Sequence, residues 1–182
     1  MSQLVPDEVL LGLLAVEPSH GYQLLEHFRN PAKLGRVWDL STSQLYAVLK
    51  RLEQQGKIYG EAVKGIDAPT RTLFHIAPAG QIQLEAWLRD PSPLASVRSV
   101  RVEFLSRLYI ICLLNRPPVP VARTQKASCL ELYHQLLAQR DRAPSGVGYL
   151  ALELQIAQLD AILQWMDRCV FRSLNLEDVD EN

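Results

Sequence analysis

Residues 41–56 read STSQLYAVLKRLEQQG and are followed by KIYGEAV at 57–63, RTLFHI at 71–76 and PAG at 78–80. The hydroxyl residues that begin at Ser41 suit a helix N-cap, because their oxygens can accept hydrogen bonds from the first free backbone amides. Apolar residues then recur at helical spacing and predict one buried face, made of Leu45, Val48, Leu49 and Leu52. Gly56 predicts the end of this helix, since glycine tolerates the left-handed backbone that follows many helices.

Two β-prone segments follow the helix, at 57–63 and 71–76, with a turn-rich segment at 65–69 between them. A helix followed by a two-stranded hairpin is typical of a winged helix, whose reading helix places its polar face in a DNA groove. At about 100° per residue, the face opposite the leucines carries Ser43, Gln44, Ala47, Lys50, Arg51 and Gln54.

The remaining chain predicts helices on both sides of this segment. Before it, we expect helices at 7–16 and at 20–28, the second capped by Ser19. After it come helices at 78–88, 97–114, 121–139 and 148–173, and the prolines of Asp90-Pro91-Ser92-Pro93 interrupt the series. The predicted fold is mainly α with a small β-hairpin wing. It consists of a winged helix-turn-helix domain at 1–90, a linker at 91–96 and a helical dimerisation domain at 97–182.

The last helix contains a heptad seam, in which apolar residues alternate steps of four and three. The seam consists of Leu152, Ile156, Leu159, Leu163, Met166 and Val170. Two interpretations are open: the core of an internal helical bundle, or an interface between subunits. We favour the interface, because Leu150, Leu154, Ile162 and Trp165 make the helix apolar over more of its surface than one partner needs.

Composition bounds the class of protein. The 182 residues carry a formal net charge of −1, which does not exclude DNA binding, because a local cluster of cations is what counts. Three widely spaced cysteines without a CxxC pair indicate reduced thiols. The N-terminus lacks the features of a signal peptide, and the apolar segment at 100–114 is short and contains charges. We expect a cytoplasmic protein that does not contact membranes.

Nothing in the chain suggests catalysis. The four histidines are scattered without an HExxH or a Cys/His cluster, so no metal site is predicted. No phosphate-binding glycine loop or nucleophile elbow occurs. We expect no enzymatic activity and no cofactor.

The first 90 residues resemble the PadR family of bacterial transcriptional regulators. The resemblance rests on His20-Gly21-Tyr22, on Leu45-Tyr46 with Leu49, on Arg51-Leu52-Glu53 with Gly56, and on Arg71-Thr72-Leu73-Phe74 with Ala79-Gly80. The helical second half is similar in layout to the longer PadR class, whose C-terminal helices form a homodimer. Ser43 replaces the usual glycine and Ala77 replaces a capping threonine. The second replacement should weaken the start of the following helix modestly.

The resemblance implies a homodimeric regulator that binds double-stranded DNA at a pseudo-palindromic operator, with half-sites roughly 34–36 Å apart. We expect it to act as a repressor, although the sequence does not identify the operator or its position. A small-molecule effector could shift the dimer geometry. The sequence contains no group of polar residues that would identify such a ligand.

The candidate DNA-binding residues come from three segments. Gln44 can pair with adenine, and Lys50 can address guanine or a phosphate. The two residues that open the second helix suit a phosphate, and the wing cations suit the backbone or minor groove. Local capping or packing for His20, a half-buried core position for Tyr46 and an ordinary solvated face for Lys50 and Arg51 remain alternatives. The set is His20, Tyr22, Ser41, Thr42, Ser43, Gln44, Tyr46, Lys50, Lys64 and Arg71.

A second class of function is open as well. A winged-helix protein that has lost operator binding would serve as a dimeric protein-interaction module. The sparse charge of the wing favours that alternative, whereas the polar, capped face of the reading helix argues against it.

Overall fold

The computed structural model describes residues 5–65 and 68–170, and no side chain is described between residues 64 and 70. The chain forms two compact units. One comprises the chain up to Asp90 together with Leu105–Arg116, and the other comprises Pro91–Phe104 and the chain from Pro117 onward. Residues 105–116 therefore fold with the first unit, although the sequence places them in the second half.

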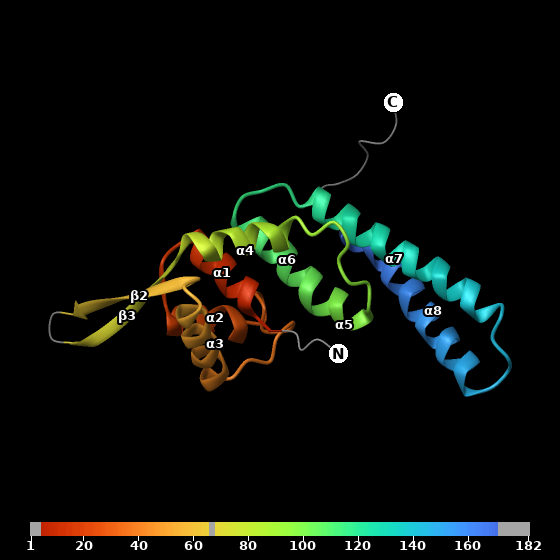
Figure 1. Cartoon of the computed structure of the whole chain (residues 1–182), viewed down its shortest axis with the longest axis horizontal. Helices are drawn as coiled ribbons and strands as arrows, with labels where there is room; N and C mark the ends of the chain where they lie inside the picture. Colours follow the sequence, from red (N-terminus) through yellow and green to blue (C-terminus); the bar gives the residue numbers. More distant parts are fainter. Residues whose placement is uncertain (1–4, 66–67, 171–182) are drawn as a thin grey trace, which may run out of the picture. The chain divides into compact units, whose positions relative to one another are not determined.

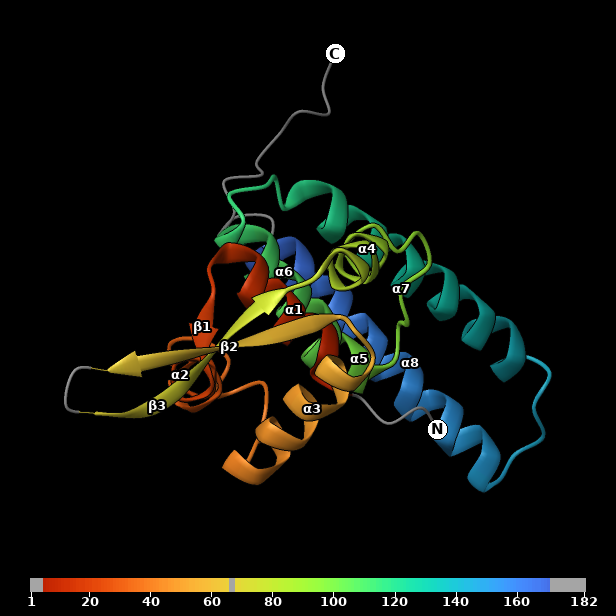
Figure 2. The same cartoon turned by 60° about the vertical axis from the view of Figure 1, so that its left-hand side comes forward.

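The first unit contains the winged helix. Its helices are α1 (Asp7–Val16), α2 (Gly21–Arg29), α3 (Thr42–Gln54), α4 (Pro78–Leu88) and α6 (Leu105–Leu113). Its strands are β1 (Ser19–His20), β2 (Ile58–Gly65) and β3 (Ala68–Ile76), and Figure 2 shows the β2–β3 hairpin extending away from α2 and α3. The predicted mainly α fold with a small β-hairpin wing is confirmed.

The sheet is antiparallel, with strand order β1-β3-β2. Ser19 pairs with Phe74, and Tyr59 pairs with His75. The prediction that Ser19 caps α2 is wrong, because pairing with a strand 55 positions later holds Ser19 in extended backbone and moves the N-cap to His20. Such pairing is long-range, so a local reading of the sequence does not show it. Both long strands also extend further into the 65–69 segment than predicted.

The local signals around α3 are confirmed. Ser41 is the N-cap, and its hydroxyl oxygen accepts a hydrogen bond from the Gln44 amide at 3.2 Å. Gly56 has a φ of 66°, the left-handed conformation that ends the helix. At the next helix, Ala77 is the N-cap of α4 and makes no side-chain capping bond, as the departure from the family pattern predicts.

The core of the first unit explains why α6 belongs to it. Leu10 and Leu11 of α1 are fully buried, and so is Ile110 of α6, which packs against α1. Arg116, at the end of this segment, donates hydrogen bonds to both carboxylate oxygens of Glu85 on α4, at 3.0 and 2.6 Å. Apolar burial and a bidentate ion pair thus hold 105–116 to the winged helix.

The second unit is helical throughout its described residues. It contains α5 (Val97–Ser99), the π-helix η1 (Val100–Phe104), α7 (Val119–Arg140), α8 (Val147–Trp165) and the π-helix η2 (Met166–Val170). Helices α7 and α8 lie side by side (Figure 1). The predicted helix at 97–114 is therefore present as α5, η1 and α6, with a π-helical turn that no sequence pattern indicated. Within the described ranges no helix has both the length and the apolar character needed to cross a membrane.

Candidate nucleic-acid interface

Helix α3 presents a polar face to solvent. One face of α3 is buried, with exposed fractions of 0–1% at Leu45, Leu49 and Leu52. The opposite face of the helix is therefore directed toward solvent. The predicted base-reading positions, Ser43, Gln44 and Lys50, are all exposed, as are Ser41 and Thr42 at the start of the helix. The amphipathic pattern in the sequence therefore places these residues correctly on the accessible face.

Hydrogen bonds order the beginning of this face. The Ser41 amide donates to Gln44 Oε1 at 2.8 Å, which completes a capping box with the bond from the Gln44 amide to Ser41 Oγ. Thr42 Oγ1 accepts a hydrogen bond at 2.9 Å from Arg29, which ends α2. The Gln44 side chain is thus already oriented before any ligand arrives, with one of its two polar atoms occupied.

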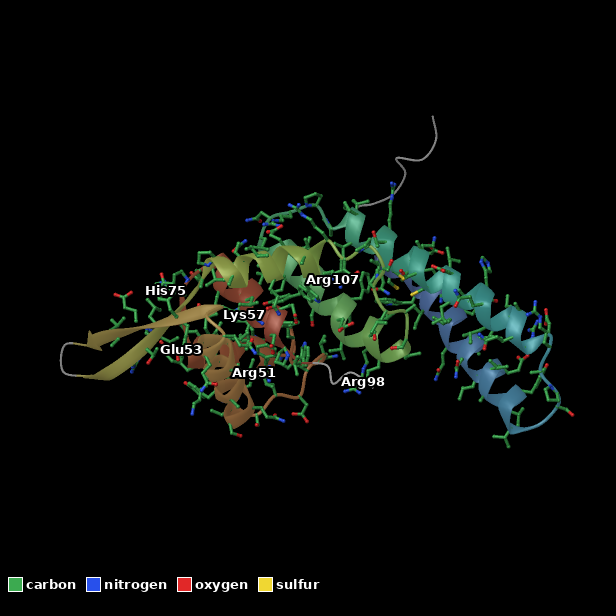
Figure 3. All side chains as sticks on the ribbon, in the orientation of Figure 1. Arg51, Glu53, Lys57, His75, Arg98 and Arg107 are labelled. Atoms are coloured by element: carbon green, nitrogen blue, oxygen red, sulfur yellow. The ribbon has the colours of Figure 1, made fainter. Side chains whose placement is uncertain are left out.

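Arg51 lies on the same helix but has a different partner. It forms an ion pair with Asp7, a buried residue at the start of α1. Figure 3 shows the Arg51 side chain at α3. Of the roles that the sequence left open for Arg51, the structure supports pairing with an acid.

A recess of about 650 Å³ lies beside α3, where α2, β1 and β3 meet. Its lining brings together four of the predicted DNA-binding residues, His20, Tyr22, Tyr46 and Arg71, with Gly21, Thr72 and Phe74. Tyr46 is 46% exposed and Tyr22 is 54% exposed, so neither is a core tyrosine. Residues from the second helix, the reading helix and the wing therefore form one concave surface.

Rings and cations contact one another inside this recess. The rings of His20 and Tyr22 are stacked with centroids 5.6 Å apart, and the Arg71 guanidinium carbon lies 5.6 Å from the centroid of the Tyr22 ring. The Nδ1 atom of His20 lies 2.8 Å from the carbonyl oxygen of Thr72. Such contacts hold side chains in place while leaving cationic and hydroxyl groups available.

The wing itself is sparsely basic. Arg71 is the one lysine or arginine whose side chain is described on the two long strands, and Lys64 lies outside the described side chains. On the same hairpin the rings of Tyr59 and His75 stack at 4.9 Å. His75 Nε2 lies 3.2 Å from Glu61 Oε2, although the alignment is not that of a hydrogen bond. Figure 3 labels His75 at the hairpin and Glu53 and Lys57 near its base.

One contact at the interface was not foreseen. Arg29 brings a guanidinium to the first turn of α3 through Thr42, and its position at the end of an amphipathic helix gave no signal beyond its charge. The sequence indicated no separate role for Gly21 within the His20-Gly21-Tyr22 motif. The structure shows that a Cβ there would lie 2.6 Å from the Tyr46 hydroxyl, so this glycine leaves space for Tyr46.

Comparison with known proteins agrees with this geometry. The pattern of the "Transcriptional regulator PadR-like family" matches residues 10–86, which contain α2, α3 and the hairpin. The chain carries a PadR-like regulator domain. The prediction of a PadR-like transcriptional regulator is thereby confirmed.

Two curated regulators are similar over most of their length. The negative transcriptional regulator PadR of Bacillus subtilis is 25% identical over 87% of this chain and 91% of its own. The probable transcriptional regulator Rv1176c of Mycobacterium tuberculosis is 22% identical over 90% of this chain and 94% of its own. Both relatives are named as regulators.

Crystal structures of PadR are also similar. Bacillus subtilis PadR in complex with operator DNA has 21% identity and a TM-score of 0.48, over 97% of this chain and 99% of that one. The same protein in complex with p-coumaric acid has 21% identity and a TM-score of 0.42, over 95% and 96%.

Outside the PadR-like domain, the heptad seam has an intramolecular role. Ile156, Leu159, Leu163, Met166 and Val170 are buried within the single chain at 0–8% exposure, and Leu152 is half-buried. Side chains buried to this degree have no surface to offer a second subunit without rearrangement. The structure thus supports the internal-bundle interpretation of the seam. A subunit interface on α8 stays a prediction, for which other residues of that helix are exposed.

Proposed function

We propose that this PadR-like protein is a homodimeric repressor that recognises a pseudo-palindromic operator and responds to a small molecule. The observation that carries the DNA-binding part is the accessible polar face of α3 beside the recess of His20, Tyr22, Tyr46 and Arg71. One unit thereby offers groups for base edges and, adjacent to them, groups for the phosphate backbone.

The capping box limits what Gln44 reads. A bidentate contact with adenine needs both the oxygen and the nitrogen of the amide, and the oxygen already accepts a bond from the Ser41 amide. While the box is intact, Gln44 is best placed to donate from Nε2, which suits guanine O6 or N7, thymine O4 and adenine N7. We therefore expect Gln44 to make a single-donor contact that does not select adenine over guanine.

The recess suits a phosphate of the DNA backbone. Arg71 brings a permanent positive charge, and the hydroxyls of Tyr22 and Tyr46 are hydrogen-bond donors. Contacts of this kind set the register of a protein on DNA and add affinity without sequence preference. Since few cations are available on the wing, the dependence of affinity on salt should be shallow.

The dimer contact is proposed on a second stripe of α8. Its members are exposed, apolar and spaced by alternating steps of three and four, as in a heptad repeat. The exposed fractions reach 83% at Val147, 66% at Leu150 and 60% at Leu154. The stripe consists of Val147, Leu150, Leu154, Ala157 and Ala161. Large apolar side chains in a contiguous exposed stripe indicate an association surface.

The second unit contains a candidate binding site for an effector. A cavity of about 380 Å³ is lined by Leu132, Leu136 and Leu159 together with Arg98 and neighbouring polar residues. This combination suits a small organic acid with an apolar body. Filling the cavity with Leu136→Trp should abolish the thermal shift that a responsive organic acid produces; an unchanged shift would place the effector elsewhere.

The function is tested by fluorescence anisotropy with the duplex upstream of the protein's own gene and a shuffled duplex, at two salt concentrations. Salt-sensitive binding that prefers the native duplex supports a sequence-specific regulator. A genome-wide selection for bound fragments covers an operator located elsewhere. Absence of any selective binding in both experiments would favour the alternative, a dimeric protein-interaction module.

The dimer is tested by light scattering coupled to size exclusion. The variant Leu150→Glu/Leu154→Glu should be a folded monomer, whereas Gln155→Glu, an exposed position off the stripe on the same helix, should remain dimeric. A dimer that persists in the double variant would exclude the stripe as the interface.

A further inference from the structure

The recess beside α3 contains a histidine whose protonation state the structure constrains. His20 pairs through its backbone with Leu73 of β3, and its ring stacks on Tyr22. The ring nitrogen Nδ1 lies 2.8 Å from the Thr72 carbonyl oxygen. A carbonyl oxygen only accepts hydrogen bonds, so Nδ1 must carry the proton and donate it.

The consequence concerns the other ring nitrogen. In a neutral imidazole with its proton on Nδ1, Nε2 carries a lone pair and can only accept a hydrogen bond. The hydrogen-bond contact of the ring observed among the described residues is the one at Nδ1. The Thr72 bond therefore excludes the neutral tautomer that would donate from Nε2.

We propose that a DNA phosphate binds in this recess and that His20 contacts it from Nε2 only as an imidazolium, so that DNA binding takes up a proton. The proposal rests on the DNA-binding function proposed above and adds a regulatory property to it. A phosphate oxygen is an acceptor, like the lone pair of neutral Nε2, so the two repel in the neutral state. Protonation converts Nε2 into a donor and adds a positive charge beside the phosphate.

The surroundings of His20 give the sign of the effect. The titratable or charged groups that line the recess with it are Tyr22 of α2, Tyr46 of α3 and Arg71 of β3. Arg71 is cationic, and none of the described residues that line the recess has a carboxylate, so no described side chain there favours the imidazolium. A bound phosphate, being an anion, does. Affinity for DNA should therefore increase as pH falls and the imidazolium form becomes available.

The other contacts do not depend on the protonation of His20. Arg71 stays charged, and the hydroxyls of Tyr22 and Tyr46 donate at either pH. Binding should therefore weaken at higher pH without disappearing. One charge-assisted hydrogen bond corresponds to about a tenfold change in affinity for each subunit that makes it.

Two substitutions separate the roles of the ring nitrogens. His20→Gln places an amide donor near the position of Nε2 that needs no protonation. His20→Asn places a donor near the position of Nδ1, which keeps a partner for Thr72 but offers nothing at Nε2. His75→Gln is the matched control, because His75 is another histidine of the same three-stranded sheet and lies beside Glu61, outside the residues that line the recess.

The experiment measures anisotropy of the full-length protein with a bound duplex at about pH 6 and about pH 8, over a series of salt concentrations. For the natural chain, affinity should be about tenfold higher per subunit at the lower pH. The slope of log affinity against log salt should also be steeper there, since the imidazolium adds a positive charge beside the bound phosphate. Calorimetry in two buffers of different ionisation enthalpy should show net proton uptake on binding.

The variants decide the assignment. His20→Gln should bind with little pH dependence and as tightly as the natural chain does at low pH, whereas His20→Asn should be weak at both pH values. His75→Gln should keep the pH response. If His20→Gln keeps the natural pH response, or if the natural chain shows none and takes up no proton, the inference is overturned while the DNA-binding function stands. If no duplex binds at either pH, both fail.

Discussion

The Trp38 indole donates a hydrogen bond from Nε1 to the Ser106 hydroxyl oxygen at 2.8 Å, between residues 68 positions apart. Trp38 lies in the loop that leads into α3, and its ring meets Phe28 of α2 edge to face, with centroids 6.4 Å apart. Ser106 is fully buried on α6. The entry to the reading helix is therefore anchored to two other helices of the first unit.

Replacement of Ser106 by alanine should destabilise the fold. The indole N–H would then lack its acceptor in a largely buried place, which costs about 1–3 kcal/mol. Urea unfolding followed by tryptophan fluorescence measures the change. In a Trp38→Phe background the same substitution should cost much less, because no donor is left unsatisfied. Equal costs in both backgrounds would show that the hydrogen bond contributes nothing.

Neighbouring cations on α3 should behave in opposite ways. Arg51→Gln removes the ion pair with Asp7 and should lower the free energy of unfolding by about 1–2 kcal/mol while leaving DNA affinity unchanged. Lys50→Gln, at an exposed position without a described partner, should lower DNA affinity and leave stability unchanged. Thermal unfolding and anisotropy on both variants test the pair. Reduced affinity in a fully stable Arg51→Gln protein would place Arg51 at the DNA instead.

A methyl group at Gly21 should disturb the recess. A Cβ there would lie 2.6–2.8 Å from the hydroxyl and ring atoms of Tyr46, so Tyr46 must move. Gly21→Ala should therefore weaken DNA binding, even though alanine favours a helix more than glycine does. In a Tyr46→Ala background the substitution should have no further effect on affinity. An additive loss would indicate that Gly21 acts through its own backbone.

We expect His27 to make the folded state less stable at lower pH. Burial lowers the pKa of His27, and the positive charge of Lys33 lowers it further. The unfolded chain then binds the proton more readily, so stability decreases as pH falls below about 6.5 and through the lower pKa of the folded state. The Nδ1 atom of His27 lies within hydrogen-bond distance of the Tyr109 hydroxyl, 2.7 Å away. His27→Asn keeps a polar group near that position and should flatten the stability profile between about pH 7 and pH 5.

The Glu85 carboxyl should affect stability at a lower pH than His27 does. The Arg116 guanidinium holds the pKa of the Glu85 carboxyl below its ordinary value of 4.5, so its contribution to stability is lost only at lower pH. Urea unfolding across the pH range distinguishes the two. If His27→Asn and the natural chain lose stability equally above pH 5, the assignment to His27 is wrong.

Much of the fold was predictable because it depends on neighbours in the sequence. The bounds of α1 and α4 agree with the predicted ranges, since helical periodicity and terminating residues act over a few positions. The N-cap at Ser41 and the left-handed Gly56 are equally local. The exposed face of α3 follows from the same period, which is why the predicted base-reading candidates are all exposed to solvent.

The predictions that differ from the structure involve contacts between residues far apart in the sequence. They concern strand pairing and the question of which partner covers an apolar helix face. Ser19 has a good capping side chain, but its backbone pairs with Phe74. The seam on α8 is a true heptad, but periodicity does not say whether the partner helix belongs to the same chain or to another, and here five of its six residues are buried within the chain. Segment 105–116 follows the proline linker in sequence, yet Ile110 finds its contacts in the first unit.

Periodicity and local motifs were enough to predict the type and approximate bounds of the elements, the polar face of α3 and the family resemblance of the N-terminal half. Which side chains meet became visible only in the folded chain. Folding brought His20 to the Thr72 carbonyl, Tyr22 to Arg71 and Trp38 to Ser106, in each case across tens of residues. Backbone preferences depend on each residue and its close neighbours in the sequence, whereas the partner of a side chain depends on how the whole unit packs.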